Sequence, residues 1–194
     1  MQASRDAEHR AGEGTHFMDI IAGLNPYGLT YHLGLQGRGT PRANPKAAGL
    51  EGFISLAREL NSRALEIWDG WLGEMADADL AALSARLKRL GMAPIVSSGL
   101  QRGNIDLCIR AARSLDARII RFALTPILCG DRAAAGPRWH ELLASVRERL
   151  AAAARQAEAN GLTIVIENHQ DFTSRELVGL CEEFGPAVRV VYDT

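Results

Sequence analysis

Residues 162–171 read LTIVIENHQD, an uninterrupted apolar run that ends abruptly in polar and ionisable side chains. A continuous run of aliphatic and β-branched residues is typical of a parallel strand that is buried on both faces. The segment therefore predicts a strand over Leu162–Ile166. Because Glu167 follows this strand directly, we expect its carboxylate to project from the rim of the sheet toward its mouth.

Similar units precede and follow this strand along the chain. Five further apolar segments are predicted to be strands, namely Asp19–Leu24, Ala64–Trp68, Ala93–Ser97, Ala117–Phe122 and Ala187–Tyr192. The stretches between them carry apolar residues at helical spacing, including a long predicted helix over Trp139–Asn160. Strands that alternate with helices imply parallel strands joined by right-handed crossovers.

Capping residues predict where several of these helices begin. Asn44, which precedes a proline, is expected to open the first helix, and Asp77 and Asn104 are expected to cap the next two. Thr173 and Glu176 have the spacing of a capping box for the last helix. These signals favour ordinary, separately capped helices between the strands.

An open doubly wound sheet and a closed eightfold barrel both satisfy this alternation. The open sheet usually carries a phosphate-binding glycine fingerprint after its first strand, but Gly34, Gly37 and Gly39 lie farther along, in a loop. A whole barrel needs about 250 residues, so about six of its eight units are expected here. We predict an incomplete (β/α)8 TIM barrel over residues 18–194, preceded by a disordered polar tail over residues 1–17.

Composition excludes several functional classes. The chain has 194 residues, 47% hydrophobic and 23% charged, with a formal net charge of −1, and it shows no basic stripe for nucleic acid. No apolar run approaches the roughly 20 residues that a membrane helix needs. Its three cysteines are widely separated, as in a reduced protein. We therefore expect a cytoplasmic protein without nucleic acid or membrane partners, which could form a homo-oligomer.

In a parallel barrel, reacting groups sit at the carboxyl ends of the strands. Asp193 follows the predicted strand Ala187–Tyr192 as Glu167 follows its own strand. Neighbouring strands lie about 4.8 Å apart, so two such carboxylates can share one divalent cation. The alternative for each carboxylate is a helix cap or an ion pair with an arginine.

Three segments resemble the sugar phosphate isomerase/epimerase family, which has the xylose isomerase-like barrel. They are IVIENHQDFTS (164–174), VVYDT (190–194) and YHLGLQG (31–37). The resemblance implies a divalent metal, manganese first, with magnesium, cobalt or zinc as alternatives. It also implies four metal ligands: a Glu after the fifth strand, an Asp after the sixth, a His near the seventh and a Glu on the eighth. By this resemblance Glu167 and Asp193 are the first two ligands, and Glu167 is also the catalytic base.

The last two ligands of that set have no counterpart in this sequence, so we expect a C-terminally truncated barrel that is inactive or weakly active alone. The resemblance implies a metal-dependent isomerase or epimerase of a sugar, sugar phosphate or sugar acid, which abstracts a proton next to a metal-bound carbonyl. The alternatives are an inactive or partner-completed module, a dehydratase or lyase, and an abasic-site endonuclease. The low net charge and only five histidines disfavour the endonuclease.

Five further side chains are expected to contact the substrate: His169, Asn168, Trp68, Arg121 and His32. His169 and Asn168 could bond sugar hydroxyls, and Trp68 could stack on a sugar face. Arg121 could hold a phosphate or carboxylate, or pair with acidic groups inside the barrel. His32 and Tyr27 lie in a long loop that could close as a lid.

Overall fold

A six-stranded parallel sheet forms the centre of the computed structural model, which describes residues 21–127, 132–169 and 171–192. Its strands are β1 (Gly23–Leu24), β2 (Ala64–Trp68), β3 (Ala93–Gly99), β4 (Ile119–Ala123), β5 (Thr163–Glu167) and β6 (Val188–Val191). They pair in chain order, and every pair is parallel. A doubly wound sheet reverses its strand order part-way, whereas a barrel does not. The predicted incomplete barrel is therefore confirmed.

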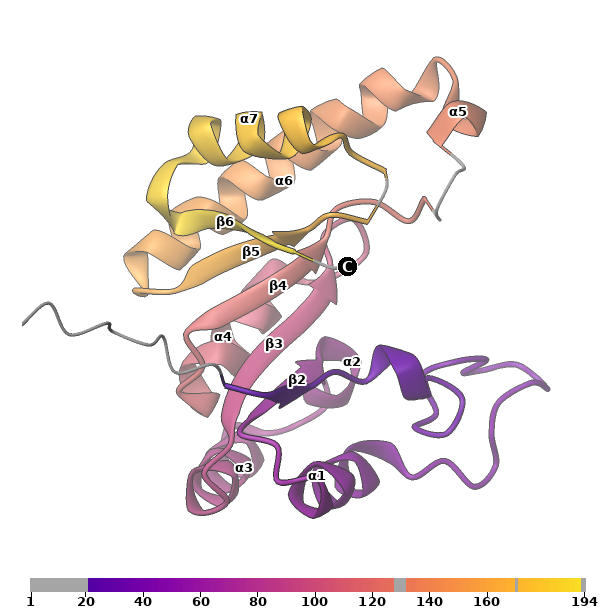
Figure 1. Cartoon of the computed structure of the whole chain (residues 1–194), viewed down its shortest axis with the longest axis vertical. Helices are drawn as coiled ribbons and strands as arrows, with labels where there is room; N and C mark the ends of the chain where they lie inside the picture. The colour runs from indigo at the N-terminus through magenta and orange to yellow at the C-terminus, as the bar shows by residue number, and fades with distance from the viewer. Residues whose placement is uncertain (1–20, 128–131, 170, 193–194) are drawn as a thin grey trace, which may run out of the picture.

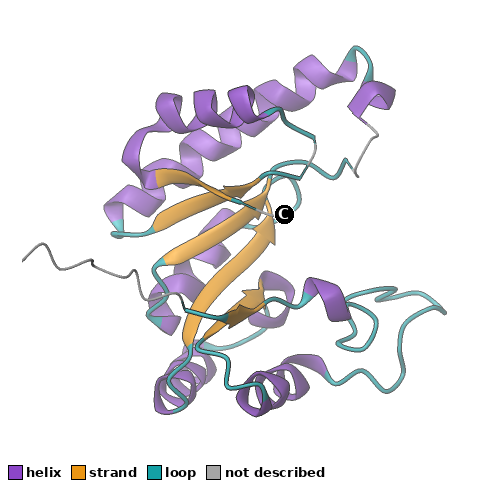
Figure 2. Ribbon diagram, viewed as in Figure 1, coloured by secondary structure: helices purple, strands orange, loops and turns teal. Residues whose placement is uncertain are grey.

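Helices lie along the outer side of this curled sheet (Figure 1). The longer ones are α1 (Gly49–Glu59), α3 (Asp77–Arg89), α4 (Ile105–Leu115), α6 (Arg138–Ala159) and α7 (Ser174–Phe184). Short helical turns are α2 (Asp69–Leu72), α5 (Arg132–Ala135), η1 (Tyr27–Leu29) and η2 (Gly185–Ala187). Figure 2 shows the same alternation of strand and helix by colour. Within the described part of the chain, no helix is both long and apolar enough to cross a membrane.

The two faces of the sheet differ in chemistry because side chains alternate along each strand. The face that packs against the helices is aliphatic and aromatic, and Ile67, Phe122 and Ile166 on it are at most 1% exposed. The inner face carries Glu66 on β2 and Arg121 on β4, between those apolar neighbours. The hydrophobic core therefore lies between sheet and helices, and the charged groups gather on the concave side.

Two of the predicted helix starts are corrected by the structure. Asn44 does not open a helix: its Oδ1 accepts a hydrogen bond from Lys46 N at 2.9 Å, and its Nδ2 donates to Tyr31 O. It thus closes a turn, and α1 begins only at Gly49. Asp77 is the first residue of α3, whose N-cap is Ala76.

The other two capping predictions are confirmed. Asn104 Oδ1 accepts from Leu107 N at 3.1 Å at the start of α4. Thr173 and Glu176 form the capping box of α7. The predicted bounds of β2 to β6 agree with the structure within two residues, and the largest differences are that β3 runs on to Gly99 and that β4 begins at Ile119. The predicted tail over residues 1–17 and the first two residues of the first predicted strand lie outside the described residues. Of the other four residues of that predicted strand, Gly23–Leu24 form β1.

Glu176 makes one prediction about stability. Arg132 binds both of its oxygens at 2.7 Å, and this hydrogen bonding, with that from Thr173, lowers the pKa of Glu176 to about 2. The carboxylate therefore stabilises the fold above its unfolded pKa, and this contribution is lost as the pH falls from about 4.5 toward about 2. Glu176→Gln keeps a capping side chain but loses the ion pair, so we expect a loss of about 1 kcal/mol at pH 7.

Urea unfolding at pH 7 and at pH 2.5 checks this. The difference between wild type and Glu176→Gln should shrink at the lower pH, because protonation removes the same charge that the mutation removes. A difference that is equal at both pH values would contradict the assignment.

Candidate active site

A cavity of about 570 Å³ opens at the carboxyl ends of the strands. Residues from β2, β4 and β5 line it, including Glu66, Trp68, Arg121 and Glu167, and His169 follows β5 into its wall. Barrel enzymes place their reacting groups at this end of the sheet. The cavity is therefore the candidate active site.

Arg121 is the charged centre of the cavity wall. Its Nη2 is in direct contact with Glu167 Oε1, and its Nη1 lies 3.4 Å from Glu66 Oε1. All three side chains are largely buried, at 10–14% exposure. The second contact is an ion pair without hydrogen-bond geometry, since Glu66 Oε1 is buried and accepts no hydrogen bond. The guanidinium is therefore bound closely to Glu167 and more loosely to Glu66.

The pKa values on this wall follow from burial and from the arginine. Burial raises the pKa of Glu66, and the nearby Arg121 and Ser97 only partly offset this effect. Burial also raises the pKa of Tyr27, against a hydrogen bond with Ser97. Burial opposes the charge on Arg121, but Glu66 and Glu167 outweigh it, so the pKa of Arg121 is raised. Arg121 therefore carries a permanent positive charge between the two glutamates.

Tyr27 fixes the plane of that guanidinium. Its ring centroid lies 4.8 Å from Arg121 Cζ, a cation–π contact, and its hydroxyl lies 3.2 Å from Ser97 Oγ. Ser97 is the β3 register partner of Arg121. The segment after β1 therefore reaches across the mouth of the sheet to β3 and β4.

Trp68 forms an aromatic part of the wall. Arg38 stacks over its ring at 5.1 Å, and Trp71 meets it edge-on at 6.1 Å. Trp71 itself packs against Phe53 of the core. Of the two indoles, Trp68 therefore lines the cavity, whereas Trp71 belongs to the core side.

The predicted site residues fall into three groups. Glu167, Arg121, Trp68 and His169 line one cavity, as expected for a shared site. Asn168 is half-buried beside Glu167 but is not part of the cavity lining, and His32 is exposed in the loop before α1. Asp193 lies outside the described residues, so the predicted pairing of Glu167 with Asp193 remains a prediction.

Glu66 is the site residue that sequence reasoning did not single out. The signal was present, because Glu66 is the one ionisable side chain within the apolar strand ALEIW. A charge inside a buried strand needs a partner, and such charges mark functional sites more often than chance. The partner of Glu66 depends on the register of β2, β3 and β4, and this register could not be predicted from the sequence.

The donors in the cavity fit one part of a divalent metal site. Glu167 offers a buried carboxylate, and His169 Nδ1 is buried without a hydrogen-bond partner. Carboxylate oxygen and imidazole nitrogen suit manganese, magnesium or zinc to different degrees. Among the described residues, however, no group of three or more His, Cys, Asp or Glu side chains could hold a metal. Further ligands would have to come from elsewhere.

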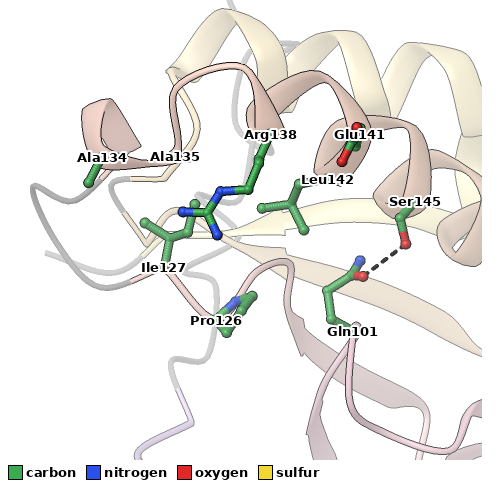
Figure 3. Close-up of a pocket in the computed structure, with 9 residues that line it drawn as sticks. All are labelled: Gln101, Pro126, Ile127, Ala134, Ala135, Arg138, Glu141, Leu142 and Ser145. Atoms are coloured by element: carbon green, nitrogen blue, oxygen red, sulfur yellow. Dashed lines mark hydrogen bonds between the residues drawn. The ribbon is translucent and has the colours of Figure 1, made fainter.

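A second cavity, of about 640 Å³, lies between the segments after β3 and β4 and the start of α6 (Figure 3). Gln101 and Ser145 are hydrogen-bonded across it at 2.9 Å, and Arg138 extends over it. No predicted site residue lines this cavity. It is therefore separate from the site built on Glu167.

The sequence model of the xylose isomerase-like TIM barrel family matches residues 54–194. The chain belongs to this family. YihM, an uncharacterized protein of Escherichia coli (strain K12), is 29% identical over 141 residues, which are 68% of this chain and 39% of YihM.

Two solved structures illustrate the shared fold. D-psicose 3-epimerase in the presence of D-fructose aligns with a TM-score of 0.58 at 20% identity, covering 76% of this chain and 58% of that chain. A family member from Mycobacterium smegmatis in complex with magnesium aligns with a TM-score of 0.59 at 18% identity, covering 88% and 63%. The chain spans less than two thirds of each protein, and the likeness establishes the shared fold.

Arg121 generates a prediction about stability. Arg121→Met removes the cation and leaves the buried Glu66 and Glu167 unpaired, so we expect a loss of about 3–5 kcal/mol in the free energy of unfolding. Arg189→Met on β6 is the matched control, because Arg189 is exposed and should change stability by no more than about 0.5 kcal/mol. Urea denaturation of both variants measures this. Equal, small effects would show that the buried ion network contributes little.

Gly70 generates a second prediction, about Trp68. A Cβ added at Gly70 would lie 2.2–2.5 Å from three atoms of the Trp68 ring. Gly70→Ala should therefore displace the indole from the cavity wall, change the near-ultraviolet circular dichroism and cost about 1–3 kcal/mol. Gly179→Ala in α7 is the control, since a Cβ there meets no atom within 4 Å. An unchanged spectrum for Gly70→Ala would contradict the packing described for Trp68.

Proposed function

We propose that the chain forms part of a metal-dependent isomerase or epimerase, which acts on a sugar by removing a proton next to a carbonyl. The observation that carries the proposal is Glu167, a largely buried carboxylate at the end of β5 that lines the cavity. A buried carboxylate that lines a cavity can act as a general base. Glu167 is thus both the proposed base and a proposed metal ligand.

A divalent cation, held by Glu167 with Asp193 and with ligands beyond the described residues, would polarise the carbonyl as a Lewis acid. Glu167 accepts the proton from the adjacent carbon. Trp68 offers an apolar surface to the C–H face of the sugar. His169, which lines the same cavity, is placed to bond a hydroxyl group.

The charge on the cavity wall bears on the substrate class. Among the described residues that line the cavity, Arg121 supplies the guanidinium, and Glu66 and Glu167 already neutralise it. A phosphate would therefore meet excess negative charge at this wall. An uncharged ketose fits it better, and one solved structure of this fold is a D-psicose 3-epimerase in the presence of D-fructose.

The proposal is tested with protein expressed from its complete reading frame, including any residues encoded after Thr194. Ketohexoses are incubated with enzyme and Mn²⁺ in deuterated water, and exchange at the carbons next to the carbonyl is followed by nuclear magnetic resonance. Glu167→Gln should lower the exchange rate about 10²- to 10⁴-fold, the usual contribution of a general base. Glu182→Gln, an exposed glutamate of α7, should leave the rate unchanged.

Metal-dependent exchange by wild type that is lost only in Glu167→Gln supports the proposal. No exchange on any ketohexose, with or without metal, would instead favour an inactive or partner-completed barrel.

A further inference from the structure

Glu66 is a buried acid to which the proposed reaction gives no role. Its side chain is 14% exposed on the inner face of β2, and its Oε1 accepts no hydrogen bond. Its charged neighbour is Arg121, whose Nη1 lies 3.4 Å away. Burial of a carboxylate is costly unless it is paired, so an incompletely bonded Glu66 calls for an explanation.

Arg121 and a metal ion would compete for the same carboxylate. The guanidinium is in direct contact with Glu167 Oε1, which is the proposed metal ligand. A cation that binds Glu167 would add positive charge next to the permanent positive charge of Arg121, and the two charges would repel each other at short range. Metal binding is therefore favoured only if another anion takes over Arg121.

We propose that Glu66 is a positioning residue that takes over the Arg121 guanidinium when a divalent cation binds Glu167. Two different nitrogens of Arg121 already face the two glutamates, so a small shift toward Glu66 completes the missing hydrogen bond. The stack on Tyr27 at 4.8 Å supports the guanidinium plane during the shift. The inference rests on the proposed role of Glu167 as a metal ligand. It adds that Glu66 releases Glu167 from Arg121.

The test is Mn²⁺ affinity, measured by electron paramagnetic resonance on the complete protein without substrate. Glu66→Gln preserves shape but removes the charge, and should weaken Mn²⁺ binding about 10- to 100-fold, as loss of groups that orient metal ligands does. Glu66→Asp shortens the side chain but keeps the charge, and should bind more tightly than Glu66→Gln. If Glu66 only filled space, Glu66→Gln would bind Mn²⁺ more tightly than Glu66→Asp, because Gln keeps the shape of the side chain. That order of affinities would contradict the proposal.

The double variant Glu66→Gln/Arg121→Gln provides a second, independent readout. Without the guanidinium of Arg121, no cation competes with Mn²⁺ for Glu167. The Mn²⁺ affinity should therefore recover to at least the wild-type value. Equal Mn²⁺ binding by wild type and Glu66→Gln would overturn the role of Glu66 while leaving the metal site intact. No Mn²⁺ binding by wild type would overturn both this inference and the proposed function.

Discussion

The contact between the Arg121 guanidinium and two buried carboxylates organises the candidate site. Glu66 and Glu167 belong to strands on opposite sides of β4, so the ion network ties β2, β4 and β5 together across the concave face. Burying three charges is expensive, and a hydrophobic replacement of the whole network could be equally stable. What the network provides is a carboxylate at the cavity whose position is set by a neighbouring cation.

The order and register of the strands place Glu66, Arg121 and Glu167 on the same face of the sheet. In a parallel sheet, register partners point to the same face, so Ser97 of β3 and Arg121 of β4 share the inner face. Glu66 lies lower on β2, level with Ile95, and Glu167 lies higher on β5, level with Val191. Arg121 bridges the difference in level because its side chain is long and its nitrogens point in different directions.

Much of the fold could be predicted from local patterns, because each strand is buried by its own helix. The run Leu162–Ile166 and the capping box at Thr173 are local signals, and both are found in the structure. Asn44 failed as a helix cap because its side chain is used by a turn and by Tyr31 O. The partner of Glu66 could not be predicted, because it depends on register and stagger over three strands.

The choice of arginine at position 121 carries a chemical consequence. A lysine ammonium is a single point charge and would have to choose one carboxylate, whereas a guanidinium presents separate donors to both and a flat face to Tyr27. Its charge is held at every accessible pH, since the pKa is raised by the two acids. The availability of Glu167 therefore depends on which of the two glutamates contacts Arg121 more closely. It does not require the arginine to gain or lose a proton.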